Sequence, residues 1–328
     1  MNNKKIGVLT SGGDSQGMNA AVYAVVRYGV ALGYEVYGFK RGYKGLIDGD
    51  YQKLTAWDVD GVINRGGTFL KTARCPEMKT EEGMAKAYET LKKLDLCGLV
   101  VIGGDGSFNG ASVLSHRFGV NVIGIPGTID NDLAYTNYTL GFDSAVNMVA
   151  KTITALRDTM SANDRSCVVQ VMGRNCGDIA LYAGIASGAE MILVPEVPYK
   201  VEDVLTRIRA NVAAGKTDNM IVLAEGAGSA VEMEDYLKPR LLPDHHLRSM
   251  VVGHLQRGDD ATSFDIFLGL RMGKHAVECL NEGLTDRVVG IRDNKIIDED
   301  IHEALAQRKT FDMNLYNYAN KLVDSFTK

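Results

Sequence analysis

Two short segments rich in glycine and aspartate each follow a run of apolar residues. Residues 103–107 (Gly-Gly-Asp-Gly-Ser) follow the apolar run 99–102, and residues 126–132 (Pro-Gly-Thr-Ile-Asp-Asn-Asp) follow the run 122–125. This pattern is typical of loops at the carboxyl ends of buried parallel strands, the edge of an open α/β sheet where ligands bind. Glycines let a phosphate approach backbone N–H groups, and aspartates serve a divalent cation or a proton transfer. The two segments therefore indicate phosphoryl transfer.

Strand-like runs alternate with amphipathic helical stretches along the whole chain. This alternation predicts an α/β fold with mostly parallel, doubly wound sheets covered by helices on both faces. The length of 328 residues suits two such three-layer α/β/α lobes. We expect strands at 6–10, 35–39, 99–103, 121–125, 166–172, 191–195, 220–224 and 250–255, and helices at 19–32, 81–94, 143–160 and 202–214.

Composition excludes several classes of function. The net charge of -5 gives no basic surface for nucleic acid. No apolar run approaches the length of a membrane span, and the amino terminus lacks the basic region of a signal peptide, so we expect no membrane partner and a cytoplasmic location. The five cysteines are scattered without a CxxC pair, and the six histidines show no ligand spacing, which argues against disulfides and against a zinc site.

A third glycine-rich segment, residues 10–19, joins the first predicted strand to a helix. Such a turn can hold a phosphate with free N–H groups and the positive end of the helix dipole. Its spacing matches neither GxGxxG nor GxxxxGK[ST], and alone it could simply be a tight turn. Likewise, Asp105 is either a Mg²⁺ ligand or a helix cap. Asp130 and Asp132 are either a base with a metal or positioning partner, or a structural turn.

Polar residues also follow three later strands, at residues 172–174, 225–226 and 253–258. Arginine and histidine at a strand end suit a sugar phosphate, because the guanidinium group binds phosphate through two hydrogen bonds. A single arginine there is more often part of a surface salt bridge. Several converging ones indicate an anionic ligand.

Seven motifs, in order and spacing, resemble those of the bacterial ATP-dependent 6-phosphofructokinases, and the resemblance covers essentially the whole chain. The motifs are residues 9–14, 64–68, 103–107, 126–132, 172–174, 195–196 and 253–258. The resemblance implies a phosphofructokinase-like fold with an ATP-binding lobe of residues 1–139 plus 257–306. A lobe for the sugar phosphate would comprise residues 140–256 plus 307–328.

The resemblance also implies roles for individual residues. Asp130 would take the proton from the sugar hydroxyl, aided by Thr128 and Asp132, while Asp105 would bind Mg²⁺, and Arg74 and Arg174 would stabilise the charge of the transferring group. The implied ATP-binding residues are Gly13, Arg74, Cys75, Gly104, Asp105, Gly106 and Ser107. The implied residues for fructose 6-phosphate are Thr128, Ile129, Asp130, Arg165, Met172, Gly173, Arg174, Glu225, Arg248, His254, Leu255, Gln256 and Arg257.

In members of this family, the residues that match Arg165 and Arg248 come from a neighbouring subunit, which implies a homotetramer with shared active sites. Two positions bear on the phosphoryl donor. Pyrophosphate-dependent relatives carry aspartate and lysine where this chain has Gly106 and Gly127. The two glycines therefore favour ATP.

The chain departs from the family pattern at the effector site for ADP and phosphoenolpyruvate. Matching residues persist as a remnant, but three expected cations are replaced by Tyr23, Ala56 and Ala214, and Asp218 stands where a histidine is common. Because charge-assisted hydrogen bonds contribute about 1.5–3 kcal/mol each, we expect weakened or altered allosteric control. The remnant comprises Arg27, Arg157, Gly188, Glu190 and Lys216.

A second departure follows Arg257, where residues 259–261 (Asp-Asp-Ala) stand in place of the family's Gly-x-Pro and the proline that would stiffen the turn is absent. These acids could weaken the binding of fructose 6-phosphate or simply point to solvent. Two alternatives to a 6-phosphofructokinase therefore stay open. One is a related enzyme for tagatose 6-phosphate or sedoheptulose 7-phosphate, and the other is a non-catalytic regulatory subunit, against which the complete set of catalytic residues argues.

Overall fold

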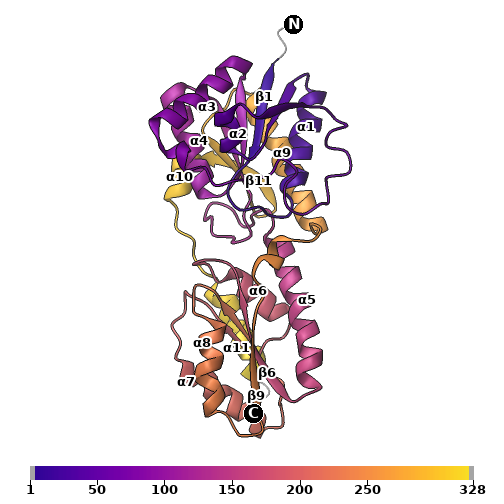
Figure 1. Cartoon of the computed structure of the whole chain (residues 1–328), viewed down its shortest axis with the longest axis vertical. Helices are drawn as coiled ribbons and strands as arrows, with labels where there is room; N and C mark the ends of the chain where they lie inside the picture. The colour runs from indigo at the N-terminus through magenta and orange to yellow at the C-terminus, as the bar shows by residue number, and fades with distance from the viewer. Residues whose placement is uncertain (1–3, 325–328) are drawn as a thin grey trace. The chain divides into compact units, whose positions relative to one another are not determined.

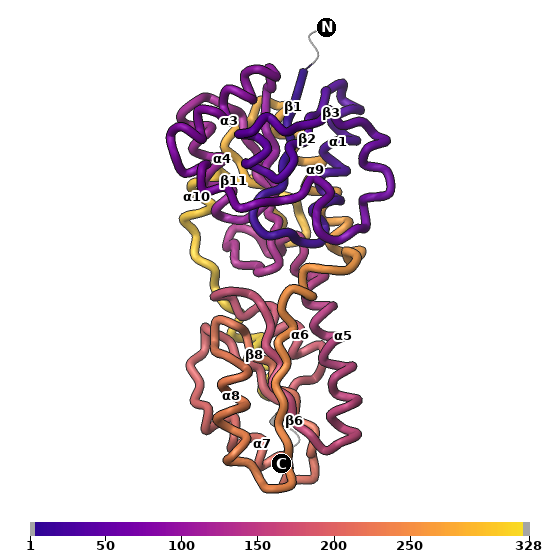
Figure 2. The backbone as a smooth tube through the Cα atoms, viewed as in Figure 1, coloured from indigo at the N-terminus to yellow at the C-terminus, as the bar shows by residue number. Residues whose placement is uncertain are grey.

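The computed structural model describes residues 4–324 and divides into two compact units, each an α/β domain (Figure 1). Unit 1 comprises Met1–Ile129, Leu133–Ser144 and Arg257–Lys309, and unit 2 comprises Asp130–Asp132, Ala145–Gln256 and Thr310–Lys328. The chain, which can be followed in Figure 2, therefore passes between the units several times. Both units have the predicted class of fold.

The units differ from the predicted lobes at their boundaries. Residues 140–144 belong to unit 1, because Gly141 N and Ser144 N both donate hydrogen bonds to the buried carboxylate of Asp265 in that unit, at 3.0 and 2.8 Å. Residues 307–309 also group with unit 1. Residues 130–132 group with unit 2, where Asn131 bonds to Asp178.

Unit 1 contains a seven-stranded sheet of order β11-β10-β5-β4-β1-β2-β3. Its five central strands are parallel, and both edge strands, β3 and β11, are antiparallel to their neighbours. The edge pair β10–β11 and strand β3 are additions to the predicted strands. The strands are β1 (Lys5–Thr10), β2 (Glu35–Phe39), β3 (Tyr51–Leu54), β4 (Gly98–Gly103), β5 (Val122–Pro126), β10 (Arg287–Arg292) and β11 (Lys295–Asp300).

Alternate residues of β4 enter two separate cores, one on each face of the sheet. Val100 and Ile102 pack in one core with side chains of α1 and α9, whereas Leu99 and Val101 pack in the other with side chains of α3 and α4. Because neighbouring residues of a strand point to opposite faces, unit 1 has three layers. Its helices are α1 (Met18–Ala31), α2 (Tyr43–Asp48), η1 (Pro76–Lys79), α3 (Glu81–Leu94), α4 (Asp105–Phe118), part of α5 (Phe142–Ser161), α9 (Ser263–Asn281) and α10 (Ile301–Ala306).

Unit 2 contains a four-stranded, fully parallel sheet of order β7-β8-β6-β9. The predicted strand at 250–255 is wrong: β9 ends at Val251, and Gly253, with φ of +55°, begins a 3₁₀ helix. A positive φ is incompatible with an extended strand, which is why the apolar run stops there. The strands are β6 (Arg165–Val171), β7 (Met191–Leu193), β8 (Met220–Ala224) and β9 (His246–Val251).

Helices also cover both faces of the second sheet. Leu193 of β7 packs in a core with α7 and α8, whereas its neighbour Ile192 faces Gly184 of α6. The two residues alternate across the strand, so α6 lies on the opposite face from α7 and α8. The helices of unit 2 are most of α5, then α6 (Asp178–Ala186), α7 (Val201–Ala213), α8 (Ala230–Leu237), η2 (Lys238–Arg240), η3 (Gly253–Arg257, whose last residue belongs to unit 1) and α11 (Met313–Asp324).

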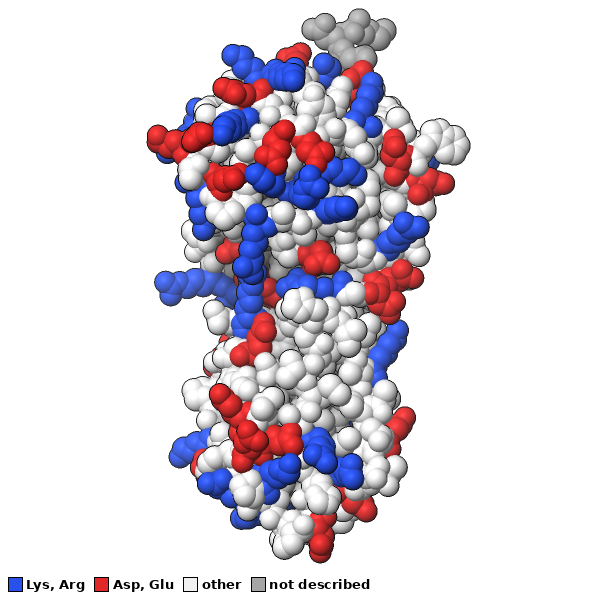
Figure 3. Space-filling model, viewed as in Figure 1, with Lys and Arg blue, Asp and Glu red and all other residues white. Residues whose placement is uncertain are grey.

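The surface carries charges of both signs. On the face drawn in Figure 3, Lys and Arg side chains are interspersed with Asp and Glu side chains. Within residues 4–324, the structure contains no helix that is both long enough and apolar enough to cross a bilayer.

Candidate active-site residues in the two units

The three glycine-rich loops predicted to bind phosphate lie at one edge of the unit 1 sheet. They follow the carboxyl ends of β1, β4 and β5, which are adjacent parallel strands. Ser11 N donates to Ile102 O at 2.9 Å, and Gly127 N donates to Gly103 O at 2.9 Å. These bonds bring the starts of the loops into register, so the sheet itself assembles this edge.

The loop after β1 is fixed from both sides. Thr72 Oγ1 donates to Gly12 O at 2.6 Å, and Arg257 Nη1 donates to Asp14 O at 2.9 Å. Gly12 has φ of +88°, a backbone conformation that favours glycine. A Cβ at Gly13 would lie 2.9 Å from Arg257 Nη1, so a side chain there would require the guanidinium group to shift away from this loop.

Gly104 and Gly106, by contrast, have open space where a side chain would stand. An ideal Cβ at either position meets no atom within 4 Å, and neither residue has a positive φ. Neither packing nor backbone conformation therefore requires glycine here. The open space at both positions is compatible with the close approach of a ligand to this loop. Gly127 differs, because its Cβ would lie 2.8 Å from Met18 Cε inside the core.

Asp105 begins α4 and is exposed, and its Oδ1 accepts a hydrogen bond from Gly106 N at 2.7 Å. The residue that caps the helix is Gly104, so Asp105 lies inside the first turn. One exposed carboxylate beside an open, glycine-lined loop fits Mg²⁺, which takes one or two carboxylates and completes its shell with water and phosphate oxygens. Ser107 is buried, and its carbonyl accepts a bond from the Tyr43 hydroxyl group at 2.6 Å.

The other predicted residues of unit 1 lie on loops. Arg74 is exposed, and Cys75, immediately before η1, is partly buried. Burial raises the pKa of the Cys75 thiol, which favours the neutral form of this side chain. Thr128 and Ile129 are buried after β5, and Thr128 O accepts a bond from Thr139 Oγ1 at 2.6 Å.

In unit 2, the structure brings Asp130 and Arg174 together. Asp130 is 1% exposed, and its Oδ2 lies 3.1 Å from Arg174 Nε. The next residue, Asn131, donates from Nδ2 to Asp178 Oδ2 at 2.8 Å, at the start of α6. Asp132 is partly buried. The segment 130–132 is thus held against the loop that follows β6.

Two side chains fix the loop of Met172, Gly173 and Arg174. Glu225 Oε1 accepts hydrogen bonds from Gly173 N at 3.2 Å and from Arg174 N at 2.8 Å. Gln256 Oε1 accepts a bond from Met172 N at 3.2 Å. Arg174 has φ of +53°, an unfavourable conformation for a residue with a side chain. The Glu225 carboxylate therefore holds Arg174 in a strained backbone that directs its guanidinium group to Asp130.

The remaining residues predicted for the sugar phosphate are spread over unit 2. His254 and Leu255 are exposed in η3, while Arg257 groups with unit 1. Arg165 begins β6. Arg248 lies on the neighbouring strand β9, where it pairs with Cys167 near the start of β6. At about 3.3 Å per residue, Arg165 lies roughly 23 Å along the strand from Met172. Within one chain, Arg165 and Arg248 are thus at the wrong end of the sheet to meet Arg174.

The predicted effector residues of unit 2 form a compact ion cluster. Glu190 Oε1 lies 3.0 Å from Arg157 Nη1 and 3.0 Å from Lys216 Nζ, and Glu190 Oε2 accepts a bond from Met220 N at 2.6 Å. Asp218 lies 3.6 Å from Arg157 and 3.4 Å from Lys216. Gly188 O accepts a bond from Arg157 at 2.7 Å. In unit 1, Arg27 lies over the ring of Tyr23.

The acidic loop after Arg257 is exposed at both Asp259 and Asp260. Asp259 has φ of +68°, a conformation that costs more for aspartate than for the glycine it replaces, and its carbonyl would lie 2.0 Å from a Cβ at Gly66. Exposed carboxylates agree with the alternative that these acids point to solvent.

Comparison with known proteins identifies the family. A family model described as Phosphofructokinase matches residues 5–280. The chain belongs to the phosphofructokinase family. A protein of Clostridioides difficile (strain 630) named ATP-dependent 6-phosphofructokinase is 54% identical over 319 residues, which cover 97% of this chain and 99% of that protein. A protein of the same name from Clostridium botulinum (strain Hall) is 51% identical with the same coverage.

Solved structures agree with this assignment. The phosphofructokinase of Saccharomyces cerevisiae is 33% identical, with a TM-score of 0.87, and the match covers 99% of this chain and 47% of the yeast chain. A pyrophosphate-dependent phosphofructokinase of Marinobacter aquaeolei has a TM-score of 0.86 at 22% identity, over 99% of this chain and 90% of that one, which shows the fold alone.

Sequence reasoning missed the residues that hold the predicted ones in place. Examples are Asp178, which binds Asn131, and Thr72, which binds Gly12. The sequence also did not predict that Glu225 accepts the bond from Arg174 N. Asp178 begins a helix after a strand, a pattern that predicts a cap but not its bond to a segment 47 residues away. The sequence carried no signal for these long-range pairs.

Proposed function

We propose that the chain transfers the γ-phosphoryl group of ATP to fructose 6-phosphate and forms fructose 1,6-bisphosphate, the 6-phosphofructokinase reaction of glycolysis. The clostridial relatives, which match nearly the full length, support this substrate pair. The single observation in the structure that carries the proposal is the buried Asp130 carboxylate, 3.1 Å from the Arg174 guanidinium group. A carboxylate accepts a proton from an attacking hydroxyl group, and a guanidinium group binds the charge on a transferring phosphoryl group.

ATP would bind at the unit 1 edge, against the loops of Gly13, Gly104 and Gly106, with Arg74, Cys75 and Ser107 around it. The open space at Gly104 and Gly106 supports this placement. Asp105 would hold Mg²⁺, which supplies positive charge that neutralises the phosphate oxygens. Fructose 6-phosphate would contact the unit 2 residues Met172, Gly173, Arg174, Glu225 and His254.

A coupled assay tests this function directly. Purified protein is supplied with Mg-ATP and, in separate reactions, with fructose 6-phosphate, tagatose 6-phosphate or sedoheptulose 7-phosphate, and then with pyrophosphate in place of ATP. The proposal predicts the highest kcat/KM for ATP with fructose 6-phosphate. Preference for another sugar would reveal a related enzyme, and no turnover with any sugar would reveal a non-catalytic subunit.

We further propose a homotetramer whose active sites are completed by Arg165 and Arg248 of a neighbouring subunit. The support is their position at the opposite end of β6 and β9 from residues 172–174. Mixing two inactive variants tests this arrangement. Asp130→Asn and Arg248→Ala chains, unfolded and refolded together, should regain activity, because some sites then receive both intact residues. If the mixture stays as inactive as its components, each site is built from one chain.

The effector remnant is proposed to be insensitive to ADP and phosphoenolpyruvate. Arg157 and Lys216 are already neutralised by Glu190 and Asp218, so a phosphate would have to displace these carboxylates. Such displacement sacrifices charge-assisted bonds that contribute about 1.5–3 kcal/mol each. We expect hyperbolic kinetics in fructose 6-phosphate, unchanged by either effector. A sigmoidal shift with phosphoenolpyruvate would contradict this proposal.

A further inference from the structure

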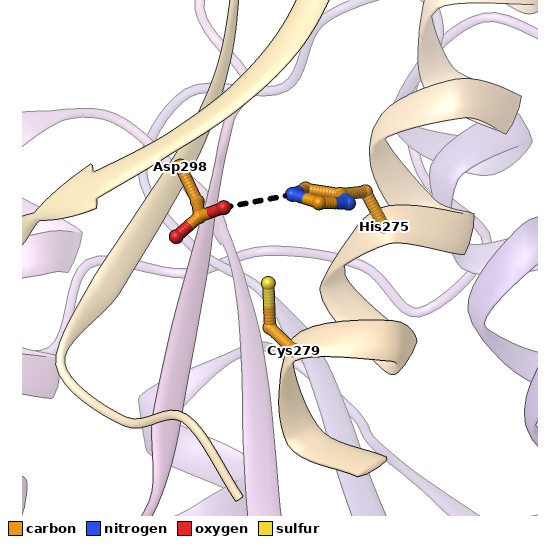
Figure 4. A group of neighbouring side chains, drawn as sticks. All are labelled: His275, Cys279 and Asp298. Atoms are coloured by element: carbon orange, nitrogen blue, oxygen red, sulfur yellow. Dashed lines mark hydrogen bonds and ion pairs between the residues drawn. The ribbon is translucent and has the colours of Figure 1, made fainter. Parts of the chain in front are cut away.

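Three side chains of types that can bind metal ions lie close together in unit 1, and none of them is among the residues proposed for ATP or sugar phosphate. They are His275 and Cys279 of α9 and Asp298 of β11 (Figure 4). Their nearest ligand atoms all lie within 4.8 Å of one another. We propose that they form a binding site for Zn²⁺ or a similar transition-metal ion.

The backbone brings the three donors together from one helix and one strand. His275 and Cys279 are four residues apart, so they lie on the same face of α9. Asp298 faces them from β11, with Oδ2 2.9 Å from His275 Nε2 (Figure 4). Bonds of about 2.0–2.3 Å to a tetrahedral zinc ion place the ligand atoms roughly 3.4–3.6 Å apart. Shifts of about 1 Å or less per side chain would reach that geometry.

The surrounding charges orient two of the ligands. Arg287 Nε donates to Asp298 Oδ1 at 2.7 Å, which leaves Oδ2 as the oxygen that faces His275. On the other side of the imidazole, His275 Nδ1 lies 3.6 Å from Glu278 Oε2. Metal-binding histidines commonly donate their second N–H to a carboxylate, and metal-binding carboxylates are themselves hydrogen-bonded. Arg287 therefore already holds Asp298, and Glu278 lies close enough to accept the second imidazole N–H after a small shift.

Burial and charge determine which ion fits. Cys279 is 1% exposed, whereas the His275 and Asp298 side chains are 28% and 20% exposed, so an ion would enter past these two. On binding, the Cys279 thiol loses its proton to solvent and the imidazole carries its proton on Nδ1, toward Glu278. Thiolate and carboxylate then neutralise the two positive charges of the ion. Sulfur and imidazole ligands select Zn²⁺ or Co²⁺ over Mg²⁺. Water fills the fourth position.

A bound ion would join α9 to the edge strand β11 and stabilise unit 1. The sequence argument against a zinc site looked for CxxC and regular histidine spacing. A site made from a His-x₃-Cys helix face and one distant aspartate has neither pattern, so that argument does not bear on it.

The full-length protein, purified without an affinity tag and treated with a chelator, is titrated with Zn²⁺ alone and separately with Co²⁺. The variants are Cys279→Ala and His275→Asn, and Cys97→Ala is the matched control because Cys97 is exposed in the same unit. We expect one Zn²⁺ per chain for the native protein and for Cys97→Ala. Affinity should fall at least tenfold in the other two variants. Co²⁺ should give a sulfur-to-metal charge-transfer band that disappears in Cys279→Ala.

Zinc should also raise the thermal unfolding temperature of the native protein and of Cys97→Ala, but not that of Cys279→Ala. If Cys279→Ala does not fold, His275→Asn, which changes a partly exposed side chain, gives the same comparison. Failure of the native protein to bind Zn²⁺, equal binding by the His275 and Cys279 variants, or a cobalt spectrum without the sulfur band would each overturn the proposal.

Discussion

The Gly106→Asp variant should impair the use of ATP without destabilising the fold. Gly106 lies in the first turn of α4, and its Cβ would enter open space. An aspartate there is well placed for the helix, because negative charge near the amino terminus stabilises a helix by about 0.3–1 kcal/mol. The substitution therefore adds a charge beside the proposed phosphate site without disturbing the packing.

The expected cost to ATP binding follows from simple electrostatics. Two like charges about 5 Å apart repel by roughly 3 kcal/mol at an effective dielectric constant of about 20. A repulsion of this size corresponds to about a hundredfold loss in kcat/KM for ATP. The thermal unfolding temperature should stay the same or rise slightly.

Steady-state kinetics with varied Mg-ATP at saturating fructose 6-phosphate measure this effect. Gly106→Ala is the control, because it adds the Cβ without the charge. The alanine variant should keep kcat/KM for ATP within a few-fold of the native value. If the aspartate variant does so too, or if the alanine variant loses as much as the aspartate variant, the placement of the ATP phosphates at this loop is wrong.

Two further predictions concern Glu225 and Asp265. Glu225→Ala removes the acceptor for Gly173 N and Arg174 N and should lower kcat about 10- to 100-fold, whereas Glu225→Gln, which keeps an acceptor oxygen, should retain most activity. Steady-state assays of both variants check this, and equal losses would contradict a positioning role. Burial raises the pKa of the Asp265 carboxyl group from 3.8 to about 6. Because the folded state binds this proton more tightly, the stabilising contribution is complete below pH 3.8 and is lost as pH rises through about 6. Urea unfolding should show the native protein losing about 3 kcal/mol relative to Asp265→Asn between roughly pH 4 and pH 7. A pH-independent difference would contradict this assignment.

The sequence predicted the repeated elements of the fold well, because parallel strands buried on both faces are continuous apolar runs. The helix at 81–94 and the strand at 35–39 have the predicted bounds. Strands β3, β10 and β11 were missed. The two antiparallel edge strands, β3 and β11, are of mixed polarity and largely partly buried, so they lack the continuous apolar run that marks a central strand. In β10 the buried run is only four residues long and lies between two arginines. The strand predicted at 250–255 failed because Gly253 reverses the sign of φ within an apolar stretch.

The candidate site also has a part that the sequence predicted and a part that it did not. Gly104, Asp105 and Asp130 stand out from the sequence, since their types and spacing are unusual at strand ends. The contacts that position them do not, because they join distant segments: Asn131 to Asp178, and Arg257 to the loop at Asp14. The spacing of residues in the sequence predicts local geometry. Contacts between distant segments depend on how the whole chain folds, so spacing does not predict them.

Turnover by the Asp130→Asn variant tests the central claim most directly. The native protein, supplied with Mg-ATP and fructose 6-phosphate, should form fructose 1,6-bisphosphate. The variant should lower kcat by at least about a hundredfold, the usual contribution of a general base, with KM for fructose 6-phosphate changed only a few-fold. A variant that keeps kcat within a few-fold of the native value would contradict the assignment of Asp130 as the base.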